Sequence, residues 1–285
     1  MHANVYPVEK MCKILNVSSS GYYYWCNHPI PKRVIRNTSL LSEIKKVYHG
    51  SKEIYGAPRI TQELNMAGIS TSQKTVARLM RENNIKSKLK RKFKITTDSN
   101  HKYPISPNLI NQNFMVARKA QVWVSDITYI KTGRGWLYLT IILDLFDRKI
   151  IGWSMSDRMN ANLTILPAWE MACKNRLINQ ELIFHSDRGV QYASDRFRKR
   201  LRAYPLVRQS MSRKGNCWDN AVAESFFKSL KVEAVYPYCF RDKNEAKLAV
   251  FKYIEAWYNQ NRRHSHLGGL TMNEFEKFNH VYYVA

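Results

Sequence analysis

The sequence predicts an α/β protein in which a mixed five-stranded sheet with helices on its faces follows an all-helical N-terminal region. From about residue 118, segments rich in Val, Ile, Trp, Thr and Tyr alternate with helical patterns in the order β-β-β-α-β-α-β-α, which is typical of a sheet covered by helices. Residues 8–86 show only helical patterns. The 285 residues suffice for one large domain and a smaller one.

The first element is a short helical segment, which we assign to residues 1–30. Residues 8–25 read as two short helices around a turn at Asn16 and Val17, with Ser18 to Ser20 as possible N-caps. The aromatic run from Tyr22 to Trp25 follows. Packing within the protein is the favoured interpretation of this run, and stacking on nucleic-acid bases is the alternative. The pattern indicates a helix-turn-helix-like segment.

The next module, residues 36–88, contains three predicted helices at 39–50, 57–68 and 70–85. On the third helix Val76, Leu79 and Met80 share one face, and basic residues at a spacing of i, i+4 and i+7 share another. Such a helix closing a three-helix unit suits helix-turn-helix docking on DNA, and an ordinary solvated face is the alternative. The expected DNA contacts are Lys74, Arg78 and Arg81.

A basic linker is predicted at residues 89–117. Its start overlaps the segment KSKLKRKFK, which has six basic residues in nine, and the polar stretch after it contains Pro104 and Pro107. The segment is either a solvated tether or a tether that also contacts phosphates. The contact residues would be Lys90, Arg91 and Lys92.

The largest domain is predicted at residues 118–235, and a C-terminal helix and tail are predicted at 236–285. Its strands are expected at 121–130, 136–146, 148–157, 181–189 and 206–211. Its helices are expected at 162–176 and 194–204, with Ser194 capping the second, and after the loop that begins at Gly215. A long helix over 244–263 follows.

The net charge of +24, from 46 Lys and Arg against 22 Asp and Glu, indicates a polyanionic partner. Nucleic acid is the favoured partner because basic side chains neutralise phosphates and release counterions. A membrane-surface helix is disfavoured because the basic residues are spread along the chain. The sequence shows no apolar run of membrane-spanning length and no signal-peptide pattern, so we expect a cytoplasmic protein.

Three carboxylates stand out in the second half of the chain. Asp126 lies within an apolar strand, Asp187 follows a buried strand at its carboxyl end, and Glu224 lies early on a helix. Acids carried by these elements can converge at one edge of a sheet. Carboxylates are ligands that Mg²⁺ prefers, and two such ions support phosphodiester transfer. The sequence therefore predicts a site for two Mg²⁺ ions, with Mn²⁺ as a possible substitute.

Each of these acids also has an ordinary structural interpretation. Glu224 could pair with Lys228 at i+4, and Asp187 could cap a turn. Asp219 is expected to cap the helix that carries Glu224. Asp144 and Asp147 are competing candidates for the metal site. For His185, next to this region, a buried and hydrogen-bonded core histidine is favoured over a role in the site.

Several motifs together resemble the DDE-type transposases of the IS-three family of insertion sequences, in their second-frame product. The matching segments are VWVSDITYI, LDLFDRKIIGWSMSDRM, FHSDRGVQYAS, RQSMSRKGNCWDNAVAESFFKSLK and YNQNRRHSHLGGLT, preceded by EIYGAPRITQELNMAGISTSQKTVARLMRENNIKSK. This resemblance spans nearly the whole chain. It implies a ribonuclease-H-like core, as in retroviral integrases, behind helix-turn-helix modules.

The resemblance implies that Asp126, Asp187 and Glu224 are the catalytic, metal-binding triad. It also implies a basic residue seven positions after the glutamate, here Lys231, which shares a helical face with Glu224 and Lys228. Arg213 and Lys214 are further candidates for phosphate contacts. Between Asp187 and Glu224 lie 36 residues, one more than is usual in the family. The extra residue is expected in the segment RAYPLV.

The function implied is cleavage of DNA at the ends of an insertion sequence, followed by strand transfer. The enzyme would bind inverted-repeat ends and target DNA as a dimer or higher multimer, near the nucleoid, and would act as a fusion with an upstream-frame partner. One alternative is an inactive or domesticated DNA-binding protein. Another is a structure-selective nuclease of the same fold that cuts without joining.

Overall fold

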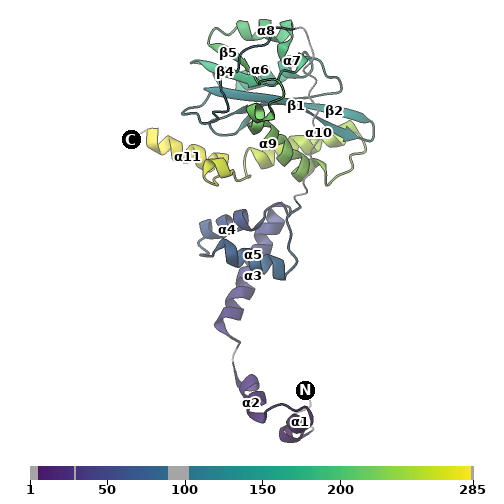
Figure 1. Cartoon of the computed structure of the whole chain (residues 1–285), viewed down its shortest axis with the longest axis vertical. Helices are drawn as coiled ribbons and strands as arrows, with labels where there is room; N and C mark the ends of the chain where they lie inside the picture. Colours follow the sequence, from purple (N-terminus) through teal and green to yellow (C-terminus); the bar gives the residue numbers. More distant parts are fainter. Residues whose placement is uncertain (1–5, 29, 89–102, 284–285) are drawn as a thin grey trace. The chain divides into compact units, whose positions relative to one another are not determined.

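The computed structural model describes residues 6–28, 30–88 and 103–283. The chain divides into two compact units, with the boundary between Ser87 and Lys88 (Figure 1). Each unit is described by itself. In the described ranges, no helix combines the length and the apolar character needed to cross a membrane.

The first unit contains only helices. The N-terminal pair is α1 (Val8–Ile14) and α2 (Ser19–Asn27), and the Ser18 side chain caps α2 by accepting the Gly21 N–H. Tyr23, Tyr24 and Trp25 are 49%, 65% and 77% exposed. The expectation that the aromatic run packs inside the protein is therefore wrong for these three residues. The physical reason is that this two-helix module provides no layer against which α2 could bury a side chain.

The helix-turn-helix module consists of α3 (Lys32–Gly50), α4 (Ala57–Met66) and α5 (Gln73–Glu82). Its three helices bury Ile44, Ile60 and Val76 completely, and Ser72 caps α5 through the Thr75 N–H. The helix α3 begins at Lys32 rather than at the expected residue 39. The Val34 N–H bonds to the Pro31 carbonyl, and no helix breaker follows this proline, so the helix extends back to it.

The second unit is built on one mixed sheet of order β3-β2-β1-β4-β5. The antiparallel strands β1, β2 and β3 are followed by β4 and β5, which run parallel to β1. This confirms the predicted mixed five-stranded sheet. The strands are β1 (Val122–Thr132), β2 (Gly135–Asp144), β3 (Ile150–Ser156), β4 (Leu182–Ser186) and β5 (Val207–Met211).

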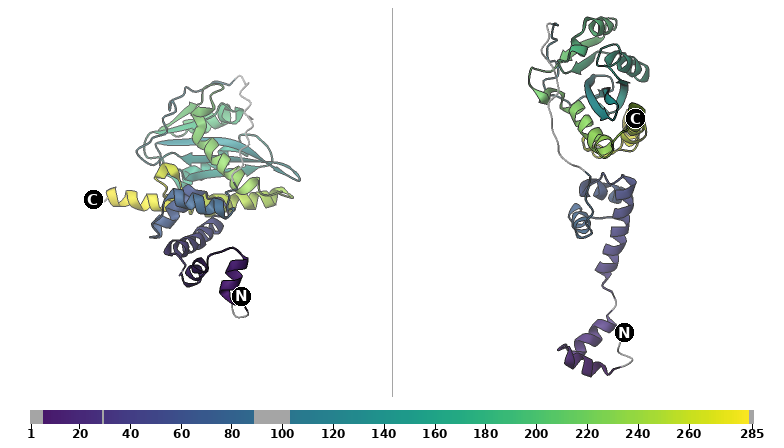
Figure 2. Two further views of the ribbon diagram at one scale, coloured as in Figure 1. Left: turned by 60° about the horizontal axis from the view of Figure 1, so that its bottom comes forward. Right: turned by 90° about the vertical axis from the view of Figure 1, so that its right-hand side faces the viewer.

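Helices cover both faces of this sheet (Figures 1 and 2). One face packs against α6 (Ile165–Asn175) and α8 (Asp195–Arg202), with Ser194 capping α8 as expected. A single-turn helix, α7 (Val190–Ala193), precedes α8 and was not expected. The other face packs against α9 (Ala221–Leu230) and α10 (Lys243–Phe251).

The C-terminal segment packs into the core of this unit. Val250, Ile254 and Tyr258 are buried against the sheet, although residues 236–285 were assigned outside the core domain. The expected long helix is α10 continued by a π-helical segment, Lys252–Tyr258, and ends before α11 (Met272–Tyr283). The buried carboxylate of Glu233, on another π-helical segment (Lys231–Val235), anchors the C-terminal segment by pairing with Arg262 at 2.8 Å.

Part of the predicted linker also packs on the second unit. The Leu109 N–H bonds to the Ser210 hydroxyl at 2.9 Å, and Ile110 is buried in the core. These contacts cover the outer edge of β5, which explains why this stretch is not a free tether. Lys90, Arg91 and Lys92 lie outside the described residues.

Candidate active site

Asp126 on β1 and Asp187, the residue directly after β4, are neighbours because these two strands are adjacent and parallel. The register pairs Ser125 on β1 with Ser186 on β4, so each aspartate is the next residue along its strand direction. Asp126 and Asp187 are both partly buried. The sheet therefore places both carboxylates at the carboxyl edge of the β1–β4 pair, as the sequence predicted.

The helix α9 brings Glu224 to the same edge. Its first residues are tied to β1, because the Asn220 side-chain amide donates to the Ser125 carbonyl at 3.1 Å, beside Asp126. Glu224 lies one turn further along α9 and is partly buried. Among the described residues, no ion pair joins Glu224 to Lys228, so the alternative pairing is not formed.

The three acids interact electrostatically. Burial raises the pKa of Asp126 well above its usual value, and the negative charges of Asp187 and Glu224 raise it further. Burial and the Asp187 charge also raise the pKa of Glu224. The phenol of Tyr192, 2.8 Å from the Ser125 hydroxyl, has a raised pKa because it is buried and faces Asp126 and Asp187. The carboxylates at this edge therefore repel one another, and the buried surroundings alone do not stabilise all three in the charged form.

The donor set fits a hard divalent cation in its chemistry. Carboxylates that repel one another are stabilised by such a cation, which coordinates oxygen ligands. In the described part of the chain, no three His, Cys, Asp or Glu side chains are gathered tightly enough to hold a metal. Asp126 accepts the Ile127 N–H at 2.8 Å, and Asp187 accepts the Gly189 N–H at 2.9 Å.

Lys231 lies beside the acids and Lys228 does not pair with them. The Lys231 ammonium is 5.4 Å from the centre of the Tyr129 ring. Burial lowers the pKa of Lys231, and the Asp126 charge opposes this by favouring the protonated form. Lys228, one turn earlier on α9, is exposed. Lys231 thus supplies a partly desolvated positive charge at the edge where the carboxylates lie.

Asp144 and Asp147 form ion pairs with Arg176 and are not a second candidate metal site. Arg176 contacts Asp144 at 2.6 Å and Asp147 at 2.7 Å, and both carboxylates are almost completely buried. Asp144 also accepts bonds from the Ala120 N–H and the Trp123 indole. One oxygen of each carboxylate is bonded to the arginine and the other accepts a backbone N–H, so these acids hold the turn after β2 against the end of α6.

Asp219 does not cap α9, contrary to expectation. The Asn220 residue occupies the N-cap position without a side-chain cap bond. Asp219 is fully buried and binds Arg213 through both the backbone N–H and the guanidinium, at 2.8 to 3.0 Å. These bonds hold the pKa of Asp219 well below its usual range. Arg213 therefore fixes the loop before α9, and Lys214 next to it is exposed.

His185 is a satisfied core histidine, as favoured from the sequence. Its ring nitrogens lie 2.8 Å from the Ser210 hydroxyl and 3.2 Å from the Ser212 hydroxyl. Burial lowers the pKa of His185 to about 4, which keeps the ring neutral at pH 7. The parallel strands β4 and β5, which α7 and α8 connect, pair without a break from Leu182–Val207 to Ser186–Met211. The extra residue between Asp187 and Glu224 thus leaves the pairing intact.

Comparison with known proteins decides the family. Family models described as "Integrase core domain" match residues 116–217 and 206–271, and a model described as "HTH-like domain" matches residues 35–93. The chain is 41% identical over 280 residues to "Transposase InsF for insertion sequence IS3A" of Escherichia coli (strain K12), covering 98% of this chain and 96% of that protein. The chain belongs to the IS3 family of insertion-sequence transposases.

A second relative of the transposase is the "Insertion element IS600 uncharacterized 31 kDa protein" of Shigella sonnei, which is 42% identical over 270 residues, or 95% of this chain and 98% of that protein. Among solved structures, a chain of the simian T-cell lymphotropic virus intasome in complex with PP2A regulatory subunit B56 gamma aligns at a TM-score of 0.46 and 14% identity, covering 81% of this chain and 73% of that chain. The HTLV-2 integrase catalytic core domain in complex with magnesium aligns at 0.38 and 20%, covering 54% and 94%. The sheet and helices of the second unit are those of a ribonuclease-H-like integrase core.

The helix-turn-helix module of the transposase carries a basic groove, defined here by Arg33, Arg36, Lys74 and Arg78. Its volume is about 720 Å³, and Ser72 and Thr75 at the start of α5 line it with hydroxyl groups. Arg78 also contacts Glu82 at 3.0 Å. Sequence reasoning missed Arg33 and Arg36 because it began α3 too late. Extending the helix back to Pro31 would have placed both on α3. Arg81 does not line the groove.

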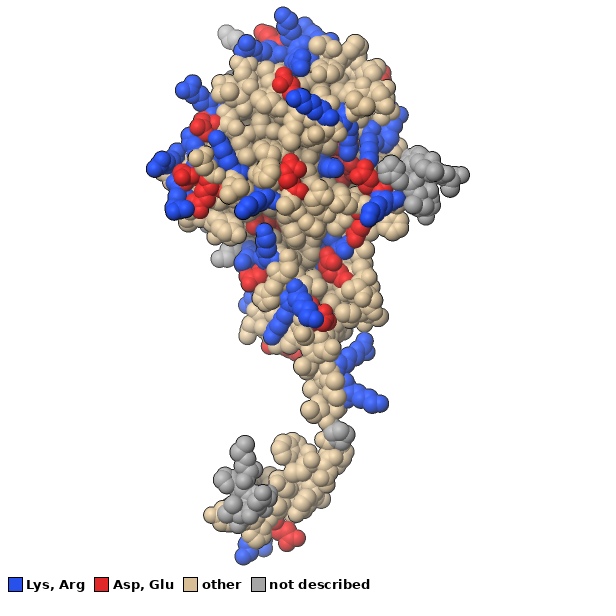
Figure 3. Space-filling model, turned by 180° about the vertical axis from the view of Figure 1, so that it is seen from behind, with Lys and Arg blue, Asp and Glu red and all other residues tan. Residues whose placement is uncertain are grey.

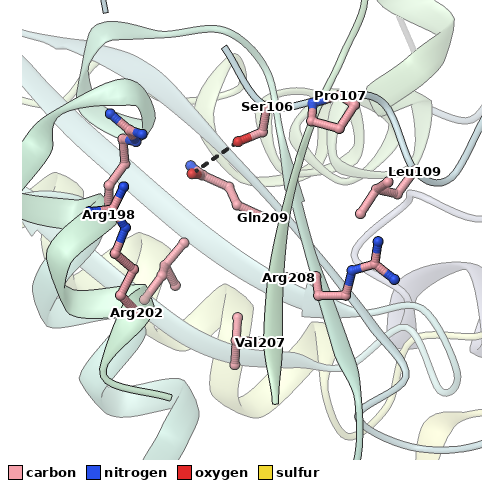
Figure 4. A pocket seen from close by; sticks show the side chains of 9 residues that line it. Ser106, Pro107, Leu109, Arg198, Arg202, Val207, Arg208 and Gln209 are labelled. Carbon is pink, nitrogen blue, oxygen red and sulfur yellow. Dashed lines mark hydrogen bonds between the residues drawn. The ribbon is translucent and has the colours of Figure 1, made fainter. Parts of the chain in front are cut away.

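The second unit, called the catalytic unit from here on, has a second basic hollow at the edge strand β5, which we name the arginine cleft (Figure 4). Arg198 and Arg202, one turn apart on α8, and Arg208 on β5 line a volume of about 340 Å³. Elsewhere Lys and Arg are spread over the visible face rather than confined to one patch (Figure 3). Sequence reasoning missed this cleft too, since only the fold brings α8 beside the end of β5.

Proposed function

We propose that the transposase cleaves the ends of its insertion sequence and joins them to new DNA at the edge formed by Asp126, Asp187 and Glu224. The observation that carries this is the strand register that makes Asp126 and Asp187 neighbours, together with the Asn220 bond that fixes the start of α9 beside them. At one sheet edge the pKa values of Asp126 and Glu224 are raised by burial and by the charge of Asp187, which supports a site for divalent cations.

The three carboxylates would hold two Mg²⁺ ions, or Mn²⁺ in their place. Such ions supply charge for activating an attacking oxygen and for stabilising a leaving oxygen. In the first step a water oxygen forms a bond to the phosphorus at the element end, and the 3′ oxygen leaves and takes up a proton. In the second step that 3′-OH forms a bond to the phosphorus of another phosphodiester, whose own 3′ oxygen leaves. No covalent intermediate with the protein is required.

The chain's other residues would position DNA rather than react. Lys231, held at the edge by the Tyr129 ring, would contact a phosphate near the acids. Lys228 and Lys214 are exposed and would add contacts further out. Arg213 is half-exposed while bonded to Asp219, so it would order the loop first and contact phosphate only with its exposed edge.

The helix-turn-helix module would bind the inverted-repeat ends through its basic groove, with Arg81 and the linker residues Lys90, Arg91 and Lys92 as further contacts. The arginine cleft would contact DNA away from the acids. Because two ends must be brought together, we propose a homodimer or higher multimer on DNA. We further propose fusion to an upstream-frame protein and action at the nucleoid in the cytoplasm.

The test is a cleavage and strand-transfer assay on supercoiled plasmid carrying the element ends, with the upstream frame fused. Reactions contain Mg²⁺, Mn²⁺ or EDTA, and compare wild type with Glu224→Gln and with the control Glu170→Gln, an exposed acid on α6. We expect metal-dependent joined products in wild type and the control, and none in Glu224→Gln. Joining that survives Glu224→Gln would overturn the proposed site.

Two further outcomes would favour the other functions. Metal-dependent cleavage without joining would indicate a nuclease of the same fold. Tight binding of the ends with no chemistry in wild type, under all three conditions, would indicate an inactive DNA-binding protein. The carboxylate edge, which is built from buried elements rather than left as a surface cluster, favours the enzyme over this last alternative.

A further inference from the structure

Trp218 is an exposed tryptophan on the loop that leads to Glu224. It lies in a single 3-10 turn, Cys217–Asn220, directly before α9, and 70% of its surface is exposed. Tryptophan is highly buried on average, because burying its large apolar surface stabilises the folded state. Its two C-terminal neighbours, Asp219 and Asn220, are 0% and 3% exposed. Within this turn the Trp218 side chain is therefore exposed, while the two residues after it are buried.

The backbone on both sides of Trp218 is fixed. The Asn216 side chain accepts the Trp218 N–H at 3.1 Å. Asp219 accepts bonds from Arg213 and from the side chains of Asn108 and Gln112, at 2.8 to 3.0 Å. These last two residues belong to a segment more than a hundred positions away in sequence, so the turn is fastened to the body of the core. An exposed side chain on a fixed turn is pre-organised for a partner.

A hydrogen bond also fixes this turn beside the sheet edge that carries Asp126 and Asp187. Asn220, two residues after Trp218, donates to the carbonyl of Ser125, the residue before Asp126. Glu224 follows on the helix that Asn220 opens. The loop before Trp218 contributes the exposed Lys214 and the half-exposed Arg213. Trp218 thus lies on the segment that joins the positively charged loop to the helix that carries Glu224.

We propose that Trp218 is a binding site for a nucleobase, on which a base next to the scissile phosphate stacks. The inference rests on the proposed function. An indole face suits every base, since stacking needs only a π surface. The fixed turn would hold the base out of the helix and so keep the scissile phosphate at the acids. Trp218 would act as a positioning residue, because the reacting atoms stay with the carboxylates and the DNA.

The test combines protein variants with single abasic nucleotides in the DNA. Duplexes carrying one element end are made with an abasic analogue at each position flanking the scissile phosphate in turn. Strand cleavage is measured for wild type, Trp218→Ala, Trp218→Phe and the control Leu177→Ala, whose side chain is 79% exposed on the same unit, before the start of β4 and away from the acids at its end. Thermal unfolding of each variant is measured alongside, and an exposed side chain should leave it unchanged.

We expect Trp218→Ala to lower cleavage of the intact duplex about 5- to 150-fold, the range of one base–aromatic stack. Trp218→Phe should recover most of this loss, and Leu177→Ala should show none of the same dependence on base position. At one flanking position the abasic analogue should lower wild-type cleavage by a similar factor and have no further effect on Trp218→Ala. That non-additivity identifies the stacked base.

Equal losses at every abasic position, or additive losses, would overturn the inference. So would Trp218→Ala activity equal to wild type on intact DNA. A loss that accompanies a change in sedimentation without DNA would instead make Trp218 a contact between copies of the chain, and would also overturn it. Failure of wild type to cleave any duplex would count against the proposed function itself, so the two failures are distinguishable.

Discussion

Replacing Arg176 by methionine should strongly destabilise the catalytic unit. The arginine side chain is 12% exposed and bridges Asp144 at 2.6 Å and Asp147 at 2.7 Å, whose side chains are 0% and 4% exposed. Removing the cation leaves two buried carboxylates without their partner. Breaking one buried pair in this way costs about 3–5 kcal/mol, and we expect Arg176→Met to lose at least that much free energy of unfolding at pH 7.

The assay is urea denaturation followed by circular dichroism, at pH 7 and at about pH 5. In wild type, burial raises the pKa of Asp144 and the Arg176 charge opposes that rise. Without the arginine the folded-state pKa of Asp144 rises further above its unfolded value. Protonation then favours the folded state, so the loss caused by Arg176→Met should shrink as the pH falls.

The matched control adds Asp144→Asn and Asp147→Asn to the Arg176→Met variant. Because the triple variant contains no buried charge at this position, it should be more stable than Arg176→Met alone at pH 7. A loss below about 1 kcal/mol, the size of a surface ion pair, would refute the reasoning. A loss that does not change between the two pH values would refute the account of Asp144.

Three further changes test other parts of the chain. Asp219→Asn should lower the free energy of unfolding by about 2 kcal/mol at pH 7; because its partner arginine lowers the folded-state pKa of Asp219, the contribution is full above about pH 4 and fades in acid, so urea titrations of variant and wild type should converge toward low pH. Gly152→Ala should cost about 1–3 kcal/mol, since the new Cβ would lie 2.2 Å from a carbonyl oxygen of α6; calorimetry should show a lowered Tm, whereas Gly50→Ala, with open space around it, should show none. Arg36→Glu in the basic groove should weaken binding of the element ends and reduce the slope of log K against log salt by about 0.9 or more; fluorescence anisotropy across salt concentrations should show a smaller effect for Lys45→Glu, which lies on the same helix but not in the groove.

The sequence predicted the elements of the catalytic unit closely because its local signals agree with the tertiary packing. Strands such as β1 are rich in β-branched and aromatic residues, and helices such as α8 begin at a serine that does cap them. The candidate acids stood out for the same reason: Asp126 interrupts an apolar strand, which elementary solvation makes costly without a partner. Motif resemblance then identified the family and predicted that these acids form its catalytic triad.

Other features depended on contacts between residues distant in sequence. The role of Asp219 was predicted wrongly because its partners include Asn108 and Gln112, which no local pattern joins to it. The sequence predicted Asp144 and Asp147 as candidate metal ligands. In the folded protein, Arg176 at the end of α6 forms ion pairs with both. The aromatic run of α2 was expected to pack inside the protein. Whether these side chains are buried depends on the elements packed against α2, which the pattern of the helix alone does not indicate.

By itself, the sequence determined the order of the strands and the strongly basic character, because both depend on local composition and spacing, and it singled out three acids as candidates for the site. Tertiary structure alone decided which charges are already neutralised inside the protein and which side chains stay exposed. Arg176 and Arg213 are bound to buried carboxylates, while Trp218 lies outward on a fixed turn. Desolvation and pairing act between surfaces that only folding brings together, so these outcomes cannot be read along the chain.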